Sequence, residues 1–381
     1  PYLDALHSFD SIATQHPDWI GRRALHLSIA SRIADKLRRN DFPMPGHEYH
    51  RDVTTRFPVI KACFERALPK LLESMQPDFF FVSPQSNPVA LSAGLPVAST
   101  KLIMASYDVE SVRLRRLAEA AAWFRRAGAE LEARRALKFE KENLALFDGV
   151  IAVSDLDKQI FVRDFQFPPE RVLVIENSVD PEYFAFQERA APEKPNIVFV
   201  GSLNYSPNYQ AAVRLLKEIM PLLRERYPKA CVWIVGQGAD DRLSELAVPE
   251  QAVITGKVDD VRPYLAMASV ACIPLSAGSG TKYKVLEAMS AGVPVVCTPM
   301  AGEGLDLEHD KHVFLGSSNS ELVSAIGRLL DNPALGTQLA KEARACVEAR
   351  FSWDANLKCL DPWLEFMQAQ PSRRLAGREA S

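Results

Sequence analysis

The sequence has no excess of positive charge and no long apolar run. Lys and Arg number 45 against 48 Asp and Glu, a formal net charge of -3. A nucleic-acid binder needs surplus basic side chains to neutralise phosphates, so we expect no nucleic-acid partner. The sequence contains no run of about 18 apolar residues, so it predicts no transmembrane helix.

Cysteine and histidine are few, with 6 and 7 residues. The cysteines are scattered through strand-like and helix-like runs, which is typical of reduced, buried thiols and predicts a cytoplasmic protein. His47 and His50 have a spacing that metal ligands can use on a helix, but no cluster of Cys or acidic residues accompanies them. We interpret them as a surface pair and predict no metal site.

A dinucleotide-binding fingerprint is also missing. The segment "VGQGADD" has two glycines at a strand end but lacks the third glycine of the fingerprint, which occurs nowhere else. NAD binding is therefore only weakly supported.

The second half of the chain alternates short apolar strands with helical segments. We predict helices at about 208–226, 259–268 and 283–291, the last capped by Gly292, and strands at 196–202, 230–236, 252–255, 270–275, 293–298 and 312–316. Continuous apolar strands separated by helices indicate a parallel sheet covered on both faces. This half is predicted to be a Rossmann-like domain.

The first half is less regular but follows the same alternation. It predicts helices at 22–39, 59–75 and within 113–147, and strands at 78–83, 100–106, 148–154 and 171–177. Because the chain starts with Pro1 and an irregular stretch, we expect this domain to lack its first members. The predicted fold class is α/β, with two Rossmann-like parallel-sheet domains that face a central cleft.

The charged, proline-containing stretch "FQERAAPEKP" indicates the linker between the domains. We predict four parts: an N-terminal domain (1–186), a linker (187–195), a C-terminal domain (196–351), and a terminal helix that braces the two domains, followed by a disordered tail (352–381).

The segment "GSGTKYKVLEAMSAGVPVV" places glycines and lysines between a buried strand and a helix. The amides of Gly280, Thr281 and Lys282 would be unpaired at the helix N-terminus, where the helix dipole favours anions. Lys282 and Lys284 cannot both point the same way on a helix, and Lys282 is the better candidate for a diphosphate. Glu287, about one and a half turns further, could accept hydrogen bonds from a sugar hydroxyl. A plain turn followed by a solvated Glu287 is the alternative.

Four other residues lie at the ends of predicted strands, at the edge where α/β sheets bind ligands. Gly201 and Ser202 end the first strand of the C-terminal domain and could also meet a diphosphate, although a plain strand-ending turn is equally compatible. Asp108 is a candidate for acceptor binding or catalysis, with a helix N-cap as the alternative. Asn177 could contact donor or acceptor.

The stretch from about Asn196 to Trp353 resembles the nucleotide-sugar domain of retaining GT-B glycosyltransferases of family 4, the glycosyl transferases group 1. The resemblance is carried by "FVGSLNYSPN", "VWIVGQGAD", "ITGKVDDVRPYLAMASV", "GSGTKYKVLEAMSAGVPVVCTPMAGEGL" and "FSW". Upstream, "YDVESVRLRR", "FDGVIAVSDLD" and "VIENSVDPEYF" resemble the later part of the acceptor domain. The similarity extends over roughly three quarters of the chain.

The resemblance implies transfer of a sugar from a nucleoside diphosphate sugar with the anomeric configuration retained. Glu287 matches the second acid of the family's Glu-x7-Glu motif, which holds the ribose hydroxyls, and Val258 matches the position whose main chain meets the base. Gly201, Gly280 and Lys282 fall in the segments around the diphosphate. The nucleotide sugar is a co-substrate, and the resemblance implies no metal or other cofactor.

The sequence departs from the family pattern at three places. Ser279 takes the position of the first acid, so a hydroxyl stands where a carboxylate is expected near the donor sugar. The Arg and Lys that often follow the first strand are absent from "GSLNYSPN", and Lys282 takes over the phosphate charge, as in members with a "GSGT(R/K)xK" form that are frequent among bacterial surface-polysaccharide transferases. The glycine-rich loop expected early in the acceptor domain is not found.

We therefore predict a glycosyltransferase in which Lys282 stabilises the leaving diphosphate and Asp108 serves acceptor binding or catalysis. The acceptor is expected to be a glycan or lipid-linked glycan, so the Arg-rich segment 113–138 could contact the inner face of a membrane; a solvated helix face is the alternative. A non-catalytic nucleotide-sugar-binding partner and a nucleotide-sugar epimerase are the competing functions. An epimerase would need acids and histidines clustered at the sugar, and the sequence indicates none.

Overall fold

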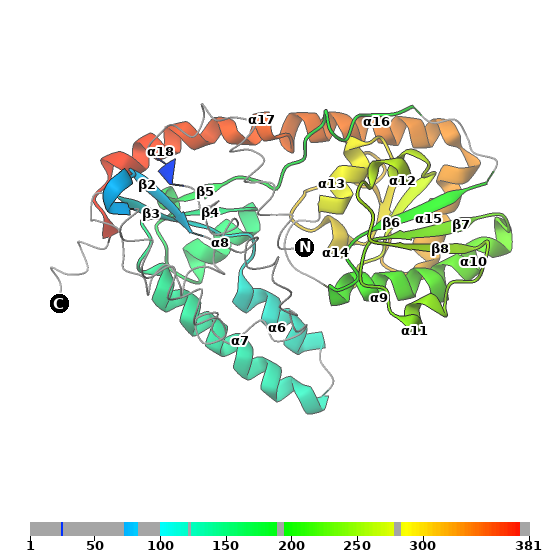
Figure 1. Cartoon of the computed structure of the whole chain (residues 1–381), viewed down its shortest axis with the longest axis horizontal. Coiled ribbons are helices and arrows are strands. Elements are labelled where there is room, and N and C mark those ends of the chain that lie inside the picture. Colours follow the sequence, from blue (N-terminus) through cyan, green and yellow to red (C-terminus); the bar gives the residue numbers. More distant parts are fainter. Residues whose placement is uncertain are drawn as a thin grey trace. The chain divides into compact units, whose positions relative to one another are not determined.

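The computed structural model describes residues 24–25, 72–82, 100–120, 123–188, 194–277 and 283–373. The chain divides into two compact units, of which the first comprises residues 1–175 and 359–381 and the second residues 176–358. Each unit contains one parallel β-sheet with helices packed on it (Figure 1). The division falls upstream of the predicted linker.

The second unit contains a six-stranded parallel sheet in the order β11-β10-β9-β6-β7-β8. All the strands predicted for this half are present: β6 (Asn196–Val200), β7 (Cys231–Val235), β8 (Ala252–Gly256), β9 (Val270–Ile273), β10 (Val295–Cys297) and β11 (Phe314–Leu315). The chain starts in the middle of the sheet, builds outward to β8, and then crosses back to β9 on the other side of β6. This is the strand order of the Rossmann fold.

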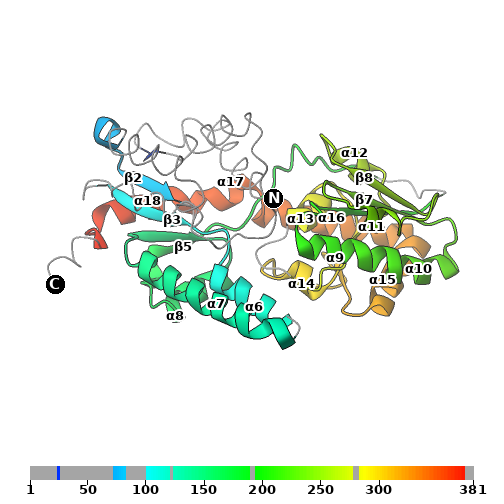
Figure 2. The ribbon, with the colours of Figure 1, turned by 60° about the horizontal axis from the view of Figure 1, so that its bottom comes forward.

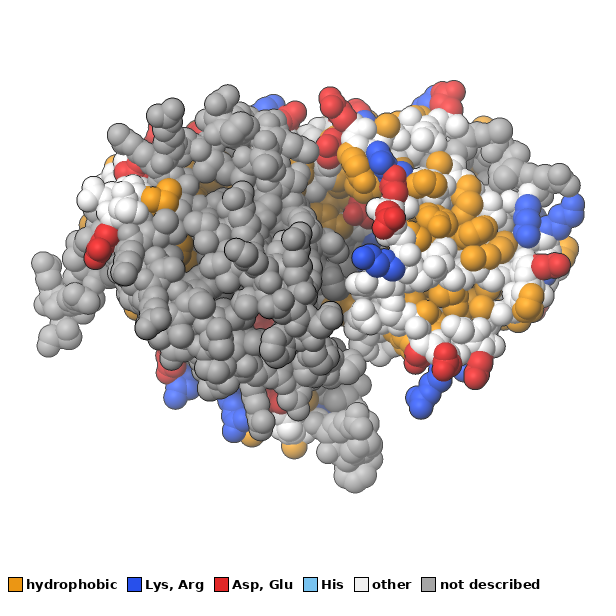
Figure 3. Space-filling model, in the orientation of Figure 1, with side chains coloured by type: hydrophobic (Ala, Val, Ile, Leu, Met, Phe, Trp, Pro, Cys, Tyr) orange, Lys and Arg blue, Asp and Glu red, His pale blue; other side chains and the backbone are white. Residues whose placement is uncertain are grey.

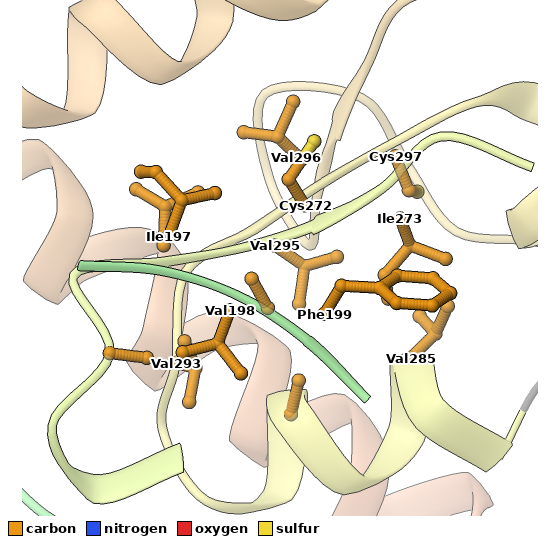
Figure 4. Packing of buried hydrophobic residues seen from close by; sticks show 14 of the residues in the cluster. Ile197, Val198, Phe199, Cys272, Ile273, Val285, Val293, Val295, Val296 and Cys297 are labelled. Carbon is orange, nitrogen blue, oxygen red and sulfur yellow. The ribbon is translucent and has the colours of Figure 1, made fainter. Parts of the chain in front are cut away.

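The core of the second unit is formed by the strands that lie at the centre of this sheet. Figure 4 shows β-branched and aromatic side chains of β6, β9 and β10 packed together. Val285, from the helix between β9 and β10, packs with them. Phe199, Cys272 and Val296 are fully buried. Burial raises the pKa of the Cys297 thiol to about 12, so it remains protonated. These strands hold their carboxyl ends rigidly at one edge of the sheet.

Helices cover both faces of this sheet. Helices α10 (Met220–Arg226) and α15 (Asn319–Asp331) pack together on one face, and α13 (Tyr283–Ser290) and α16 (Pro333–Arg350) pack together on the other (Figures 1 and 2). The predicted helix 208–226 is present, but a π-helical turn at Leu215–Ile219 separates α9 (Ser206–Arg214) from α10. Pro221 explains the interruption, since it lacks an N–H and its ring would clash with the carbonyl four residues earlier.

Shorter helices complete the second unit. They are α11 (Asp241–Ser244), α12 (Arg262–Ala266), α14 (Pro299–Gly302) and α17 (Trp353–Asn356). Because α12 has only five residues, it covers its part of the sheet thinly, and Trp233 and Tyr264 are only half-buried. Figure 3 shows apolar side chains gathered on the second unit where Figure 1 draws α12, β7 and β8.

The first unit contains a five-stranded parallel sheet in the order β1-β2-β3-β4-β5. Its strands are β1 (Ala24–Leu25), β2 (Phe79–Val82), β3 (Lys101–Ala105), β4 (Gly149–Ala152) and β5 (Val172–Val174), and the last four confirm the sequence prediction. The prediction of a helix over 22–39 is wrong at Ala24–Leu25, because these residues pair with Phe79 and Phe80 of β2. Because the two paired segments are more than fifty residues apart, the residues around Ala24 do not indicate that a strand forms there.

Helices also lie on both faces of the first sheet. Helix α8 (Asp155–Arg163) packs on the face formed by Val150 and Ala152, while α18 (Leu360–Ala369) packs on the opposite face (Figures 1 and 2). A Cβ at Gly149 would stand 2.8 Å from the Trp363 ring, so glycine at this position lets α18 approach the strand closely. The helices α6 (Glu110–Ala120) and α7 (Trp123–Leu144) form a hairpin between β3 and β4.

The segment that enters the second unit is fixed there by the helices near its end. The Val179 amide donates to the Phe351 carbonyl (2.8 Å), and the Asn356 amide donates to the Ser178 hydroxyl (2.8 Å). Both bonds lie within the second unit, which begins at Glu176. The predicted terminal helix corresponds to α17 in the second unit and α18 in the first, so the chain returns to the first unit at Cys359.

Candidate functional site

The topology places one candidate site at the carboxyl edge of the second sheet. The chain runs outward from β6 through β7 on one side and through β9 and β10 on the other, so the strand order reverses between β6 and β9. Loops at such a reversal diverge to opposite faces and leave a crevice in which α/β proteins bind ligands. The loops concerned are residues 201–205, after β6, and residues 274–282, between β9 and α13; the structure describes the latter to residue 277.

Two glycines let the main chain of neighbouring strands come very close at this edge. A Cβ at Gly236 would stand 2.1 Å from the Gly201 carbonyl oxygen, and Gly236 has a φ of +147°. A Cβ at Gly201 would stand 2.8 Å from the Asn208 amide nitrogen and 3.2 Å from Cε of Lys284. Glycine is needed at Gly236, where a Cβ would overlap main-chain atoms, whereas a Cβ at Gly201 would crowd the side chains of Asn208 and Lys284. The predicted contact of Gly201 with a diphosphate stays a prediction.

Lys284 lies at this edge of the sheet. Its ammonium donates to the Asn208 side-chain carbonyl (2.9 Å) and lies 5.8 Å from the centre of the Phe199 ring on β6. The sequence interpretation favoured Lys282, which lies outside the described residues together with Ser279, Gly280 and Thr281. Sequence reasoning missed Lys284 and Asn208 as site residues.

The buried hydroxyl of Ser202 has no hydrogen-bond partner among the residues that the structure describes. A buried polar atom without a partner is unfavourable by about 1–3 kcal/mol, so such atoms often mark a place for a ligand or water. Ser202 directly follows Gly201, and its carbonyl accepts a hydrogen bond from the Asn208 amide (2.9 Å). The predicted residues Gly201 and Ser202 are thus brought together with Lys284.

Helix α13 begins at Tyr283, next to this cluster. The Tyr283 hydroxyl donates to the Asn177 side-chain carbonyl (2.7 Å), and Asn177 is buried. The candidate Asn177 is therefore brought to the first residue of α13. Glu287 lies one turn further on the same helix and is half-buried. Lys284 and Glu287 are three positions apart, a spacing that places them on one face of a helix and that could have indicated Lys284 from the sequence.

Val258 follows β8, the edge strand on the far side of β7. Its side chain is half-buried against the core of the second unit. The nearby Asp260 accepts hydrogen bonds from the amide and guanidinium of Arg262, which hold its carboxyl pKa below the ordinary value. Val258 thus lies at the same edge of the sheet as Gly201, in a separate loop with fixed conformation.

Asp108 lies in the first unit, in the loop between β3 and α6. The Ser106 hydroxyl donates to the Asp108 carbonyl (3.0 Å). The alternative of Asp108 as a helix cap is not what the hydrogen bonds at the start of α6 show. The amides of Glu110 (2.8 Å) and Ser111 (3.2 Å) both donate to the carboxylate of Glu140 on α7. A residue thirty positions away therefore fixes the end of the loop that carries Asp108.

Glu140 is expected to make the first unit less stable as the pH rises. Burial raises the Glu140 pKa to about 7, and the neighbouring Glu110 carboxylate, itself paired with Arg113, also raises it, whereas the two amides lower it. The folded protein then binds a proton more tightly than the unfolded chain, so stability falls between about pH 4.5 and 7. Glu140→Gln removes this dependence. The free energy of unfolding of this variant should therefore increase by about 2 kcal/mol relative to that of wild type from pH 5 to 8.

Urea denaturation of both proteins at the two pH values measures this difference. Glu142→Gln, on the exposed face of the same helix, serves as the matched control. A difference between Glu140→Gln and wild type that stays constant with pH would contradict the assignment.

Two further features concern metals and membranes. The described residues contain no group of three or more His, Cys, Asp or Glu side chains that could hold a metal ion. Within the same residues, no helix has the length and apolar character needed to cross a membrane. On α7, part of the predicted membrane-contact segment, Arg126 pairs with Glu130 (3.0 Å). Exposed ion pairs of this kind fit a solvated helix face.

Residues 194–332 match the family Glycosyl transferases group 1. The chain is 27% identical over 226 residues to an uncharacterised glycosyltransferase, MJ1607, of Methanocaldococcus jannaschii, a match that covers 54% of this chain and 56% of the relative. Sucrose-phosphate synthase from Thermosynechococcus elongatus superposes with a TM-score of 0.65 at 17% identity, covering 87% of both chains. Anabaena HepE, in complex with UDP and glucose, superposes with a TM-score of 0.62 at 15% identity, covering 87% of this chain and 89% of HepE.

The chain has the GT-B fold. The two parallel-sheet units are the two α/β domains of this fold, and the family match lies in the second, which contains the site described above. The chain spans about half the length of the curated relatives it matches, 56% of the first and 45% of the glycogen synthase of Mycobacterium tuberculosis.

Proposed function

We propose that the protein transfers a sugar from a nucleoside diphosphate sugar to an acceptor with retention of the anomeric configuration. The observation that carries the proposal is the position of the Lys284 ammonium, held at the β6–β9 reversal beside the main chain of Gly201. A cation at the carboxyl edge of a parallel sheet suits a diphosphate, and the segment that supplies this cation matches a glycosyltransferase family.

In the proposed complex the diphosphate lies against Gly201, Ser202 and Lys284. The Ser202 hydroxyl, which has no partner within the described ranges, would donate to a phosphate oxygen after a change of rotamer. Glu287, on the same helix face as Lys284, would accept hydrogen bonds from the ribose hydroxyls. The main chain at Val258 would meet the base, and Asn177 would lie near the donor sugar or acceptor.

The chemical step is a front-side displacement at the anomeric carbon. The bond from that carbon to the diphosphate oxygen breaks, the bond to the acceptor oxygen forms, and the acceptor proton passes to a diphosphate oxygen. Negative charge therefore develops on the leaving diphosphate, where Lys284 and the N-terminus of α13 stabilise it. In this proposal Gly280, Thr281 and Lys282 also serve the diphosphate, Ser279 the donor sugar, and Asp108 the acceptor; no metal takes part.

The proposal also names a first donor and a class of acceptor. The HepE structure holds UDP and glucose, so UDP-glucose is the first donor to test. The acceptor in this proposal is a glycan or a lipid-linked glycan. A lipid-linked acceptor would bring the protein into peripheral contact with the inner face of a membrane.

Calorimetric titration of the purified protein with UDP and GDP tests the nucleotide site. We expect one of them to bind, and Glu287→Gln to weaken that binding at least fivefold, because the amide accepts one ribose hydroxyl less well than the carboxylate. Undiminished binding by Glu287→Gln would contradict the proposed ribose contact, and the absence of any nucleotide binding would overturn the proposal.

A non-catalytic nucleotide-sugar-binding protein is the second candidate, favoured by Ser279 in place of the family's first acid. Radiolabelled UDP-glucose separates the two functions. Slow hydrolysis of the bound donor, with label released as free glucose, indicates an enzyme. Tight binding without hydrolysis, and without transfer to any glycan acceptor supplied, indicates a binding protein.

A further inference from the structure

Asn208 is a buried amide whose two polar atoms are both used at the candidate site. It lies in the first turn of α9 and is 5% exposed. Its amide nitrogen donates to the Ser202 carbonyl (2.9 Å), and its carbonyl oxygen accepts from the Lys284 ammonium (2.9 Å). One side chain therefore joins the loop after β6 to the helix after β9.

The chemistry of the two partners defines the orientation of this amide. A main-chain carbonyl can only accept a hydrogen bond, and an ammonium can only donate one. Exchanging the amide oxygen and nitrogen would lose both bonds, so the Asn208 oxygen must face Lys284. A side chain with both a donor and an acceptor is required here, and leucine, which is similar in size, has neither.

The charge of this acceptor also matters. An amide oxygen holds the ammonium without neutralising it, whereas a carboxylate in the same place would form an ion pair with Lys284 and repel a phosphate group. The Asn208 side chain packs directly on the main chain of Gly201, since a Cβ built there would stand 3.0 Å from Asn208 Cγ. This packing leaves the amide little freedom to move. Asn208 therefore holds the ammonium at a defined place without adding a negative charge beside it.

We propose that Asn208 is a positioning residue that holds Lys284 for the donor diphosphate by means of a neutral hydrogen bond. The inference rests on the proposed function, in which Lys284 contacts the diphosphate. It assigns to Asn208 no contact with the substrate and no role in binding the nucleoside. Its effect must therefore depend on Lys284 and on the phosphates of the ligand.

Calorimetric titration with UDP and uridine tests this in wild type, Asn208→Ala, Lys284→Met and the double variant. Asn208→Ala should weaken UDP binding about five- to tenfold, which is the net contribution of one typical hydrogen bond. In the Lys284→Met background the same substitution should change UDP affinity less than twofold. Uridine affinity should not change in any variant.

Asn208→Asp tests the requirement for a neutral acceptor with nearly the same shape. We expect it to weaken UDP binding more than Asn208→Ala does, while its melting temperature stays near that of wild type. This variant also keeps the inference testable should Asn208→Ala fold poorly. UDP binding by Asn208→Asp as tight as wild type would overturn the inference.

The remaining outcomes separate the inference from the proposed function. Equal losses for Asn208→Ala in both backgrounds, or an equal loss of uridine affinity, would show a merely structural role and overturn the inference alone. Wild-type protein that binds neither UDP nor GDP would overturn the proposed function, and the inference with it.

Discussion

Lys284→Met is expected to weaken binding of UDP by about 30-fold or more, the largest effect of any single side chain at the site. A charge-assisted hydrogen bond to a phosphate contributes about 1.5–3 kcal/mol, and methionine keeps the apolar stem while removing the charge. The Lys284 side chain also lies over Phe199, so the apolar part of that packing should be retained. Isothermal titration calorimetry with UDP measures the change.

Lys217→Met is the matched control for this experiment. Lys217 is exposed on the π-helical turn of the same unit, and its substitution should leave UDP affinity within twofold of wild type. Lys282→Met adds a direct comparison between the lysine that the sequence favoured and the one that the structure places at the edge of the sheet. A loss confined to Lys282→Met would show that Lys284 is not the phosphate ligand.

Gly236→Ala is expected to lower the free energy of unfolding of the second unit by about 3 kcal/mol or more. Two independent effects act together: the φ of +147° is strained for any residue with a Cβ, and that Cβ would stand 2.1 Å from a main-chain oxygen. Main-chain atoms of β6 cannot move aside without breaking the pairing with β7. Urea denaturation followed by circular dichroism measures the loss.

Two glycines serve as controls for this prediction. Gly256 has a φ of +69°, but a Cβ at this position would have no atom within 4 Å. Gly256→Ala should therefore lower the free energy of unfolding by only about 1–2 kcal/mol. Gly128→Ala, in the exposed interior of α7 with nothing within 4 Å, should raise stability by about 0.5–1 kcal/mol. Equal stabilities for Gly236→Ala and Gly256→Ala would contradict the close contact at Gly201.

The strands show what local pattern can predict. Runs such as "NIVFVGS" and "ACVWIVG" are largely apolar because both faces of a parallel strand are covered. A short segment is enough to show this pattern. The same holds for Gly292, whose φ of +74° ends α13 as its position in the sequence indicated. The π-helical turn before Pro221 was missed, although the proline itself was the signal.

The position of Lys284 shows what local pattern does not reveal. Two lysines in alternate positions differ in direction by about 200° on a helix, but the sequence does not say where the first turn begins. The contact between Lys284 and Asn208, 76 positions apart, places Lys284 beside β6, and Lys282 lies outside the described residues. Glu140 is a similar case, since no local feature connects it with the start of α6.

The order of residues by itself determined the two sheets, the loops at their carboxyl ends and the family that the second unit resembles, because hydrophobic period and glycine positions are properties of short segments. The tertiary structure decided which side chains meet at the reversal of strand order: Lys284 with Asn208, and Tyr283 with Asn177. Those contacts depend on the packing of strands and helices that are far apart in the chain, so the sequence of a short segment cannot predict them.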